Sequence, residues 1–229
     1  VPTLLGKFKD LGLEICIEQN AGAKASCADE EYTANATVCS RKEVLQNSDI
    51  VVCINAPSDE DLALLRPETL VISQFQSFID DKVAPKLKGM NLRAFGMDVI
   101  PRTTLAQSMD VLSSMASIAG YKAVLDAASR LPRYLPMMIT AAGSIKPAKV
   151  LILGAGVAGL QAIATARRLG ATVEVFDTRA AVKEEVQSLG ARFVEVAGAK
   201  DESSAGGYAV EQSEEFLQRQ RAEVADRAS

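Results

Sequence analysis

Three glycines at fixed spacing give the strongest chemical signal in the sequence. Gly154, Gly156 and Gly159 form the pattern G-x-G-x-x-G in "KVLILGAGVAGLQ", between an apolar run and a helix-compatible run. In this pattern the first glycine permits a tight turn, the second lets the backbone approach a pyrophosphate, and the third lets the helix pack closely on the strand. The first N–H groups of the helix then bind the anion. The motif predicts a dinucleotide site rather than a plain glycine-rich turn.

An acid downstream of this motif indicates which dinucleotide binds. Asp177 ends the next apolar run, "TVEVFD", at roughly the ~20-residue offset where a carboxylate accepts hydrogen bonds from the adenosine ribose. Its charge would repel a 2′-phosphate, which favours NAD over NADP. Arg179 complicates this, because an arginine here can pair with a 2′-phosphate. We interpret Arg179 as lying near the adenine or pairing with a helix acid such as Glu184, and we predict NAD.

A second polar cluster lies in the stretch "IPRTTLAQSMDVLSS", residues 100–114. Gln107 or Ser108 could cap a helix there, and Asp110 could be an acid favoured by the positive end of the helix dipole. The same side chains could instead form half of an active site whose other half lies elsewhere in the chain. The residue types alone leave both interpretations open.

Alternating strands and helices must position these residues. Short apolar runs bounded by turn residues alternate with more polar, helix-compatible stretches, which is typical of parallel sheets with helices on both faces. The sequence therefore predicts an α/β protein with two Rossmann-like lobes. The predicted strands are 13–18, 49–54, 69–74, 92–97, 149–153, 172–176 and 192–196, and the clearest predicted helices are 157–169 and 180–189.

A long helix is predicted to join the two lobes, because apolar and small residues recur at helical spacing from about Gln107 to Arg130. We therefore predict a first α/β lobe over 1–106, a connecting helix over 107–130 and a Rossmann lobe over 131–229. Only three strands are visible in the second lobe, where such domains usually have about six. We expect the first lobe to lack its N-terminal strand and the second its C-terminal strands. Met137 and Met138 are interpreted as core.

Composition excludes some classes of function. The formal net charge is -4 and no basic block occurs, so nucleic acid is not an expected partner. No apolar run approaches the ~20 residues that a membrane span needs. The four cysteines are interpreted as free, mostly buried thiols, because none forms a C-x-x-C pair, and no metal site is predicted. They are Cys16, Cys27, Cys39 and Cys53.

The sequence contains no histidine, the commonest general acid–base residue. A dehydrogenase that acts on an alcohol or an amino acid must move a proton together with the hydride. Hydride transfer from one nicotinamide to another moves no proton at the reacting carbons. The protein then needs only to hold two rings at reacting distance in a site without water. The composition therefore favours transfer between nucleotides.

Four stretches of the chain resemble one family. They are "PRTTLAQSMDVLSSMASIAGYKAV", "MMITAAGSIKPAKVLILGAGVAGLQAIATARRLGA", "FDTRAAVKEEVQSLGARF" and "AGGYAVEQSEEF". Together they resemble the NAD(H)-binding component of proton-translocating NAD(P)⁺ transhydrogenases, in the superfamily that contains alanine dehydrogenase. The run R-x-x-x-A-Q-S-M-D-x-L-S-S is the feature that distinguishes the transhydrogenases from their amino-acid dehydrogenase relatives.

The resemblance implies roles for particular residues. The polar loop would lie at the nicotinamide end of the site, in the cleft between the lobes, with Gln107 reaching toward the second nucleotide. The implied catalytic residues are Arg102, Gln107, Asp110 and Ser113. The implied NAD(H)-binding residues are Arg102, Thr103, Thr104 and Leu105 at the ribose and nicotinamide, Gly154, Gly156, Val157 and Gly159 in the glycine motif, Asp177, Thr178 and Arg179 at the adenosine, and Gly207, Tyr208 and Gln220 in a flap and the helix after it.

The resemblance also implies a function. The chain would bind NAD(H) and exchange hydride with NADP(H) held on a partner component, while a membrane component translocates protons. It would form a homodimer on the cytoplasmic side of a membrane, or on the matrix side in a mitochondrion. Two alternatives stay open: an amino-acid dehydrogenase of the alanine dehydrogenase type, and a non-catalytic NAD-binding module.

Overall fold

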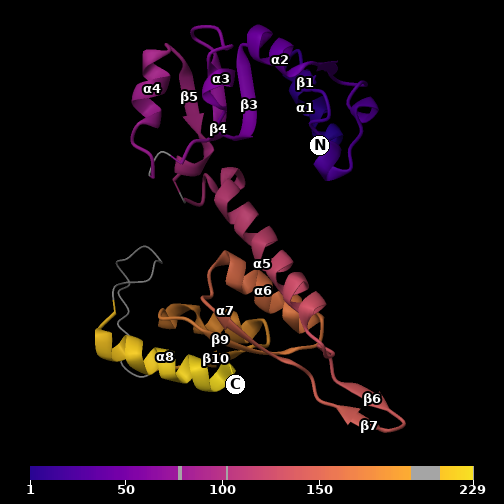
Figure 1. The fold of residues 1–229 in the computed structure, drawn as a ribbon, viewed down its shortest axis with the longest axis vertical. Coiled ribbons are helices and arrows are strands. Elements are labelled where there is room, and N and C mark those ends of the chain that lie inside the picture. The colour runs from indigo at the N-terminus through magenta and orange to yellow at the C-terminus, as the bar shows by residue number, and fades with distance from the viewer. Residues whose placement is uncertain (77–78, 102, 197–211, 229) are drawn as a thin grey trace. The chain divides into compact units, whose positions relative to one another are not determined.

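The computed structural model describes residues 1–76, 79–101, 103–196 and 212–228 (Figure 1). It divides into two compact units, Val1–Val111 and Leu112–Ser229. Each unit is built on parallel strands alternating with helices, so the predicted α/β class is confirmed. The predicted domain limits at residues 106 and 130 stay a prediction.

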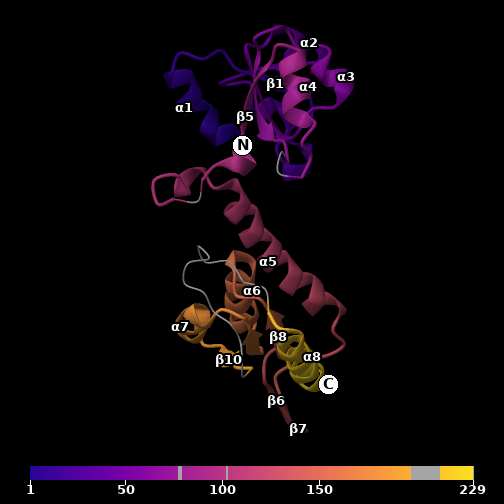
Figure 2. The same ribbon diagram turned by 90° about the vertical axis from the view of Figure 1, so that its left-hand side faces the viewer.

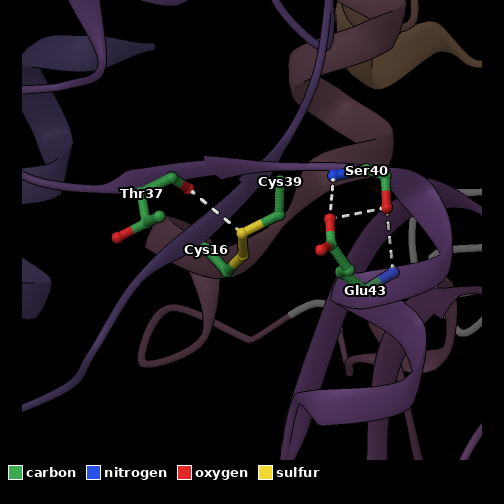
Figure 3. Close-up of a disulfide and its surroundings, with 5 residues drawn as sticks. All are labelled: Cys16, Thr37, Cys39, Ser40 and Glu43. Atoms are coloured by element: carbon green, nitrogen blue, oxygen red, sulfur yellow. Dashed lines mark hydrogen bonds between the residues drawn. A yellow bond between two sulfur atoms is a disulfide. The ribbon is translucent and has the colours of Figure 1, made fainter.

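Unit 1 begins with helices η1 (Pro2–Leu4) and α1 (Leu5–Asp10). Strand β1 (Cys16–Glu18) pairs in parallel with β2 (Thr37–Cys39), and helix α2 (Arg41–Asn47) follows. The sequence did not predict β2 or α2. Their junction is stabilised by a capping box, in which Ser40 Oγ accepts from the Glu43 N–H at 3.3 Å and the Glu43 carboxylate accepts from the Ser40 N–H at 2.9 Å (Figure 3).

A disulfide joins Cys16 of β1 to Cys39 of β2 (Figure 3). The interpretation of all four cysteines as free thiols is wrong for this pair. Cys39 lies opposite Glu18 in the register, two residues along from Cys16, and the two Cα atoms are 6.2 Å apart. That distance lies within the range that disulfides span. The other two cysteines, Cys27 and Cys53, are free and half-buried.

The main sheet of unit 1 has three parallel strands in the order β3-β4-β5. Apolar residues on the helix-covered face form the core. Val71 in the central strand is fully buried. The elements are β3 (Ile50–Asn55), α3 (Asp59–Leu62), β4 (Leu70–Gln74), α4 (Val83–Gly89) and β5 (Arg93–Gly96), followed by η4 (Met97–Val99) and η5 (Gln107–Met109).

The predicted long helix is confirmed as α5 (Val111–Arg130). It begins four residues later than predicted, because Gln107–Met109 forms a short 3₁₀ turn and Asp110 has a non-helical backbone (φ −75°, ψ 86°). Among the residues described, no helix combines the length and apolar character that crossing a bilayer requires.

A hairpin of two short antiparallel strands follows α5: β6 (Met138–Thr140) and β7 (Gly143–Ile145). The sequence did not predict it. The hairpin extends away from the sheet of unit 2 in both views (Figures 1 and 2). Met137 and Met138 are therefore 60% and 37% exposed, and their interpretation as core residues is wrong.

The sheet of unit 2 has three parallel strands in the order β10-β9-β8. Ile163 of the first helix and Val175 of the central strand are fully buried in its core. The elements agree with the predicted ones to within a few residues: β8 (Lys149–Leu153), α6 (Val157–Arg168), β9 (Thr172–Phe176), η6 (Ala180–Val182), α7 (Lys183–Ser188) and β10 (Arg192–Val194).

Helix α8 (Glu214–Ala228) completes the described part of unit 2. Near its start, Phe216 is fully buried against Phe176 and Val194. Near its end, Arg227 Nη1 donates to Glu174 Oε2 at 2.8 Å. One apolar anchor and one ion pair therefore fix both ends of α8.

Candidate nucleotide-binding site

The glycine motif forms the turn from β8 into α6. Gly154 has φ +96°, a conformation that side chains other than glycine rarely adopt. Its N–H donates to the Phe176 carbonyl at 2.7 Å, which ties the turn to the end of β9. A Cβ on Gly159 would lie 1.8 Å from the Gly154 carbonyl oxygen, so only glycine lets helix and turn pack this closely. A Cβ on Gly156 would meet no atom within 4 Å, so space is open at the middle of the turn.

Helix α6 presents its N-terminus at this open space. Gly156 is its N-cap residue and makes no side-chain cap bond. Val157, the first helical residue, is 43% exposed. The first N–H groups of a helix have no partner within the helix and lie at the positive end of its dipole. The turn can therefore hold an anion such as a pyrophosphate.

Asp177, directly after β9, binds both the glycine turn and Arg179. Its Oδ2 accepts from the Ala155 N–H at 2.7 Å and from Arg179 Nη2 at 2.8 Å. Its Oδ1 accepts from the Arg179 N–H at 2.8 Å and from Arg179 Nε at 2.9 Å. The sequence suggested a helix acid such as Glu184 as a partner for Arg179. The structure pairs it with Asp177 instead.

The charge of Asp177 is stabilised in place. Its side chain is only 5% exposed, and this burial raises the pKa of the carboxyl. The hydrogen bonds from Arg179 and from the Ala155 N–H outweigh burial, so the pKa of Asp177 lies below its ordinary value. Asp177 is therefore ionised at neutral pH, and its neighbour Thr178 is half-buried beside it in the chain.

Helix α5 packs directly on the first turns of α6. A Cβ on Gly120 would lie 2.0 Å from the carbonyl oxygen of Ala158, the second residue of α6. Ser117 Oγ donates to Gln161 Oε1 at 3.3 Å one turn further along. This contact positions the anion-binding end of α6. It was not predicted from the sequence, although an isolated glycine inside a helical pattern is a signal of close packing.

The predicted nicotinamide loop lies in unit 1 up to Val111 and enters α5 there. Its side chains are mostly exposed, with Leu105 92% exposed, while Asp110 and Ser113 are half-buried. Thr103 Oγ1 accepts from the Ala106 N–H at 3.4 Å within the loop. Ala106, and neither Gln107 nor Ser108, stands at the N-cap of the short η5 turn. The exposed members of this loop include Thr103, Thr104 and Gln107.

Three predicted site residues lie outside the described residues: Arg102, Gly207 and Tyr208. Gln220 lies on α8, where it is half-buried. In unit 2 the structure brings together the glycine turn, the α6 N-terminus, Asp177 and Arg179.

Asp98, which sequence reasoning missed, shapes a second loop. Its Oδ1 accepts from the Phe75 N–H at 3.0 Å and its Oδ2 from the Gln76 N–H at 2.8 Å. It holds the turn after β4, where Gln76 has φ +53°. An acid directly after a strand of a parallel sheet was the available signal.

Two family models match the chain. The model described as "Alanine dehydrogenase/PNT, N-terminal domain" matches residues 1–119, and the one described as "Alanine dehydrogenase/PNT, C-terminal domain" matches residues 123–228. The two matches together span nearly the whole chain.

Individual relatives agree with these models. The chain is 42% identical over 228 residues to the first of the separate chains that make up NAD(P) transhydrogenase subunit alpha in Rhodospirillum rubrum, covering 96% of this chain and 59% of that protein. A solved transhydrogenase from Sinorhizobium meliloti superposes with a TM-score of 0.82 at 43% identity, covering 85% of this chain and 59% of that one. A solved L-alanine dehydrogenase has a TM-score of 0.72 at 24% identity over 84% of this chain and 55% of that one, which shows a shared fold. The chain thus spans about three fifths of the length of these two transhydrogenase relatives.

Proposed function

Because this chain belongs to the alanine dehydrogenase/PNT family, we propose that it binds NAD(H) and exchanges hydride with NADP(H) held on a partner component. It is a homologue of NAD(P) transhydrogenase subunit alpha at 42% identity. The relatives named as transhydrogenases match it far more closely than two alanine dehydrogenases do, at 22% and 23% identity.

The observation that carries the proposal is the glycine turn with its adjacent acid. A left-handed Gly154, an open Gly156 and the N-terminus of α6 together form a cradle for a pyrophosphate. Asp177 lies 2.7 Å from the Ala155 N–H of the same turn, so the carboxylate and the cradle are held in one rigid arrangement. This arrangement suits a dinucleotide whose ribose lies beside its pyrophosphate.

We further propose that Asp177 selects NAD(H) over NADP(H). An ionised carboxylate accepts hydrogen bonds from ribose hydroxyls and repels a 2′-phosphate. Val157 would lie against the dinucleotide at the start of α6, where it is 43% exposed. The remaining adenosine-side and flap residues keep their proposed roles: Thr178, Arg179, Gly207, Tyr208 and Gln220.

The polar loop supplies the nicotinamide end in this proposal. Arg102, Thr103, Thr104 and Leu105 would contact the ribose and nicotinamide, while Asp110 and Ser113 would hold the carboxamide. Gln107 is exposed on η5, and its amide could donate to one nucleotide and accept from the other. Such a bridge would keep two rings at reacting distance.

The bound nicotinamide supplies the hydride chemistry, and the chain's own residues bind, orient and exclude water. No proton is transferred at the reacting carbons, and the chain contains no histidine that could accept one. Side chains that do not titrate near neutral pH, such as Gln107 and Ser113, are sufficient for orientation. The chain therefore needs preorganised polar contacts rather than a general base.

The proposed partners are an NADP(H)-binding component and a membrane component that translocates protons, with this chain as a homodimer at the membrane surface. The test uses the full-length protein combined with its NADP(H)-binding component and without the membrane component. Hydride should pass from NADH to an NADP⁺ analogue, and NADH should not be oxidised by pyruvate with ammonia. Turnover with pyruvate and ammonia but none with the nucleotide would assign the chain to the alanine dehydrogenase type.

A further inference from the structure

We propose that the Arg179 guanidinium occupies the position on Asp177 that the adenosine ribose takes when NAD(H) binds, so that the cofactor must displace it. This inference rests on the proposed function and concerns the same site. It makes Arg179 a residue that lowers NADH affinity rather than one that raises it.

The first step is the number of hydrogen bonds at Asp177. An ionised carboxylate has about four acceptor positions. Two are filled by backbone groups, the Ala155 N–H at 2.7 Å and the Arg179 N–H at 2.8 Å. The other two are filled by the Arg179 side chain, Nε at 2.9 Å and Nη2 at 2.8 Å. A ribose hydroxyl therefore has no acceptor position left on Asp177 while the guanidinium stays.

The second step is what remains after the guanidinium leaves. The two backbone donors still hold the carboxylate, one on each oxygen. One acceptor position then opens on Oδ1 and one on Oδ2, because Nε binds the first and Nη2 the second. The fork of an arginine presents two parallel N–H donors to a carboxylate. The cis-diol of a ribose also presents two neighbouring O–H donors, so it can replace the fork bond for bond.

The third step is access. The Asp177 side chain is 5% exposed and the Arg179 side chain is 21% exposed. The guanidinium is thus the more accessible half of the pair, and a ligand that reaches the carboxylate meets it first. A 2′-phosphate carries negative charge and offers no O–H at the 2′ position when ionised, so it cannot replace the fork. Displacement therefore keeps the preference for NAD(H).

The test is NADH titration of the purified chain carrying Arg179→Met, a side chain of similar length without charge or donors. Removing the competitor should tighten NADH binding by at least about threefold, since a partly buried ion pair no longer has to be broken. ADP-ribose, which carries the adenosine half, should show the same gain, and nicotinamide mononucleotide should show none. Asp177→Asn added to Arg179→Met should abolish the gain.

Two controls separate this role from a structural one. Arg192→Met removes an arginine of the same unit whose ion pair is with Glu174, and it should leave NADH affinity at the parent value. Arg179→Lys keeps the charge and loses the fork, so its gain should lie between parent and Arg179→Met. This variant also decides the matter if Arg179→Met does not fold.

Weaker NADH binding in Arg179→Met and Arg179→Lys would show that Arg179 contacts the cofactor and would overturn the inference. Unchanged affinity would overturn it too, because the pair would then stay intact on binding. If the parent and every variant bind no NADH, the proposed function itself fails. That result differs from a parent that binds NADH and an Arg179→Met chain that binds it less tightly.

Discussion

Replacing Gly120 by alanine should damage unit 2 through the contact between α5 and α6. The added Cβ would lie 2.0 Å from the Ala158 carbonyl oxygen and 2.8 Å from the Ala158 carbonyl carbon. Carbon and carbonyl oxygen in close contact are normally about 3.3 Å or more apart. The two helices must therefore separate by roughly 1 Å at this point, and both obstructing atoms are backbone atoms that cannot rotate away.

The magnitude follows from two opposing terms. Overpacking of a well-packed contact costs about 1–3 kcal/mol. Alanine in place of glycine inside a helix stabilises by about 0.5–1 kcal/mol. Since backbone is displaced, we expect the cost to lie in the upper part of its range and the net loss to be about 1–2 kcal/mol. Ala158 is in the first turn of α6, so NADH affinity should fall as well.

The assay is urea unfolding followed by circular dichroism, beside NADH titration of the same sample. Gly6→Ala is the matched control, because Gly6 also lies in a helix and its added Cβ would meet nothing within 4 Å. The control should unfold at the parent urea concentration or slightly above it. A Gly120→Ala chain as stable as the control, with parent NADH affinity, would refute the argument that this contact positions the α6 N-terminus.

Three further results are expected. Hydrogen bonds from Arg41 hold the pKa of Asp61 below its unfolded value, so their stabilisation is present above about pH 4 and is lost as pH falls through the folded pKa. In acid urea titrations, Arg41→Met should therefore lose less stability than the parent, and an equal loss would contradict this. Gln107→Asn in the reconstituted complex should slow hydride transfer by about 10-fold or more while changing NADH affinity by under ~1 kcal/mol, because its proposed contact is to the second nucleotide; parent rates in stopped flow would exclude the bridge. Alkylation of the unfolded, unreduced chain should label Cys27 and Cys53 alone, as read by mass spectrometry, and four labelled thiols would contradict the disulfide.

The features that sequence could predict are those set by local chemistry. The roles of Gly154 and Gly159 depend on backbone conformation and on the strand and helix directly beside them, so the motif was enough. Strands such as 172–176 were found because branched residues follow one another in a bounded run. The long helix was found from its spacing, and only its start was misplaced, where a 3₁₀ turn precedes Val111.

The features that sequence could not predict depend on contacts between distant residues. Strand β2 has three residues and is defined by pairing with β1, so the Cys16–Cys39 disulfide was hidden with it. The exposure of Met137 results from a hairpin that the apolar side chains did not signal.

The pairing of Arg179 with Asp177 was missed for a different reason. The two residues are only two apart, but both side-chain nitrogens reach the carboxylate because the chain bends after β9. Side-chain competition for one carboxylate needs coordinates.

The central claim is that the glycine turn and Asp177 bind NAD(H) in preference to NADP(H). Its most direct test is equilibrium titration of the purified, folded chain with NADH and with NADPH, followed by nicotinamide fluorescence. NADH should bind at least ~10-fold more tightly, a difference of about 1.4 kcal/mol, and Asp177→Ser should narrow that difference. Equal affinities for the two nucleotides in the parent chain, or no binding of either, would contradict the account.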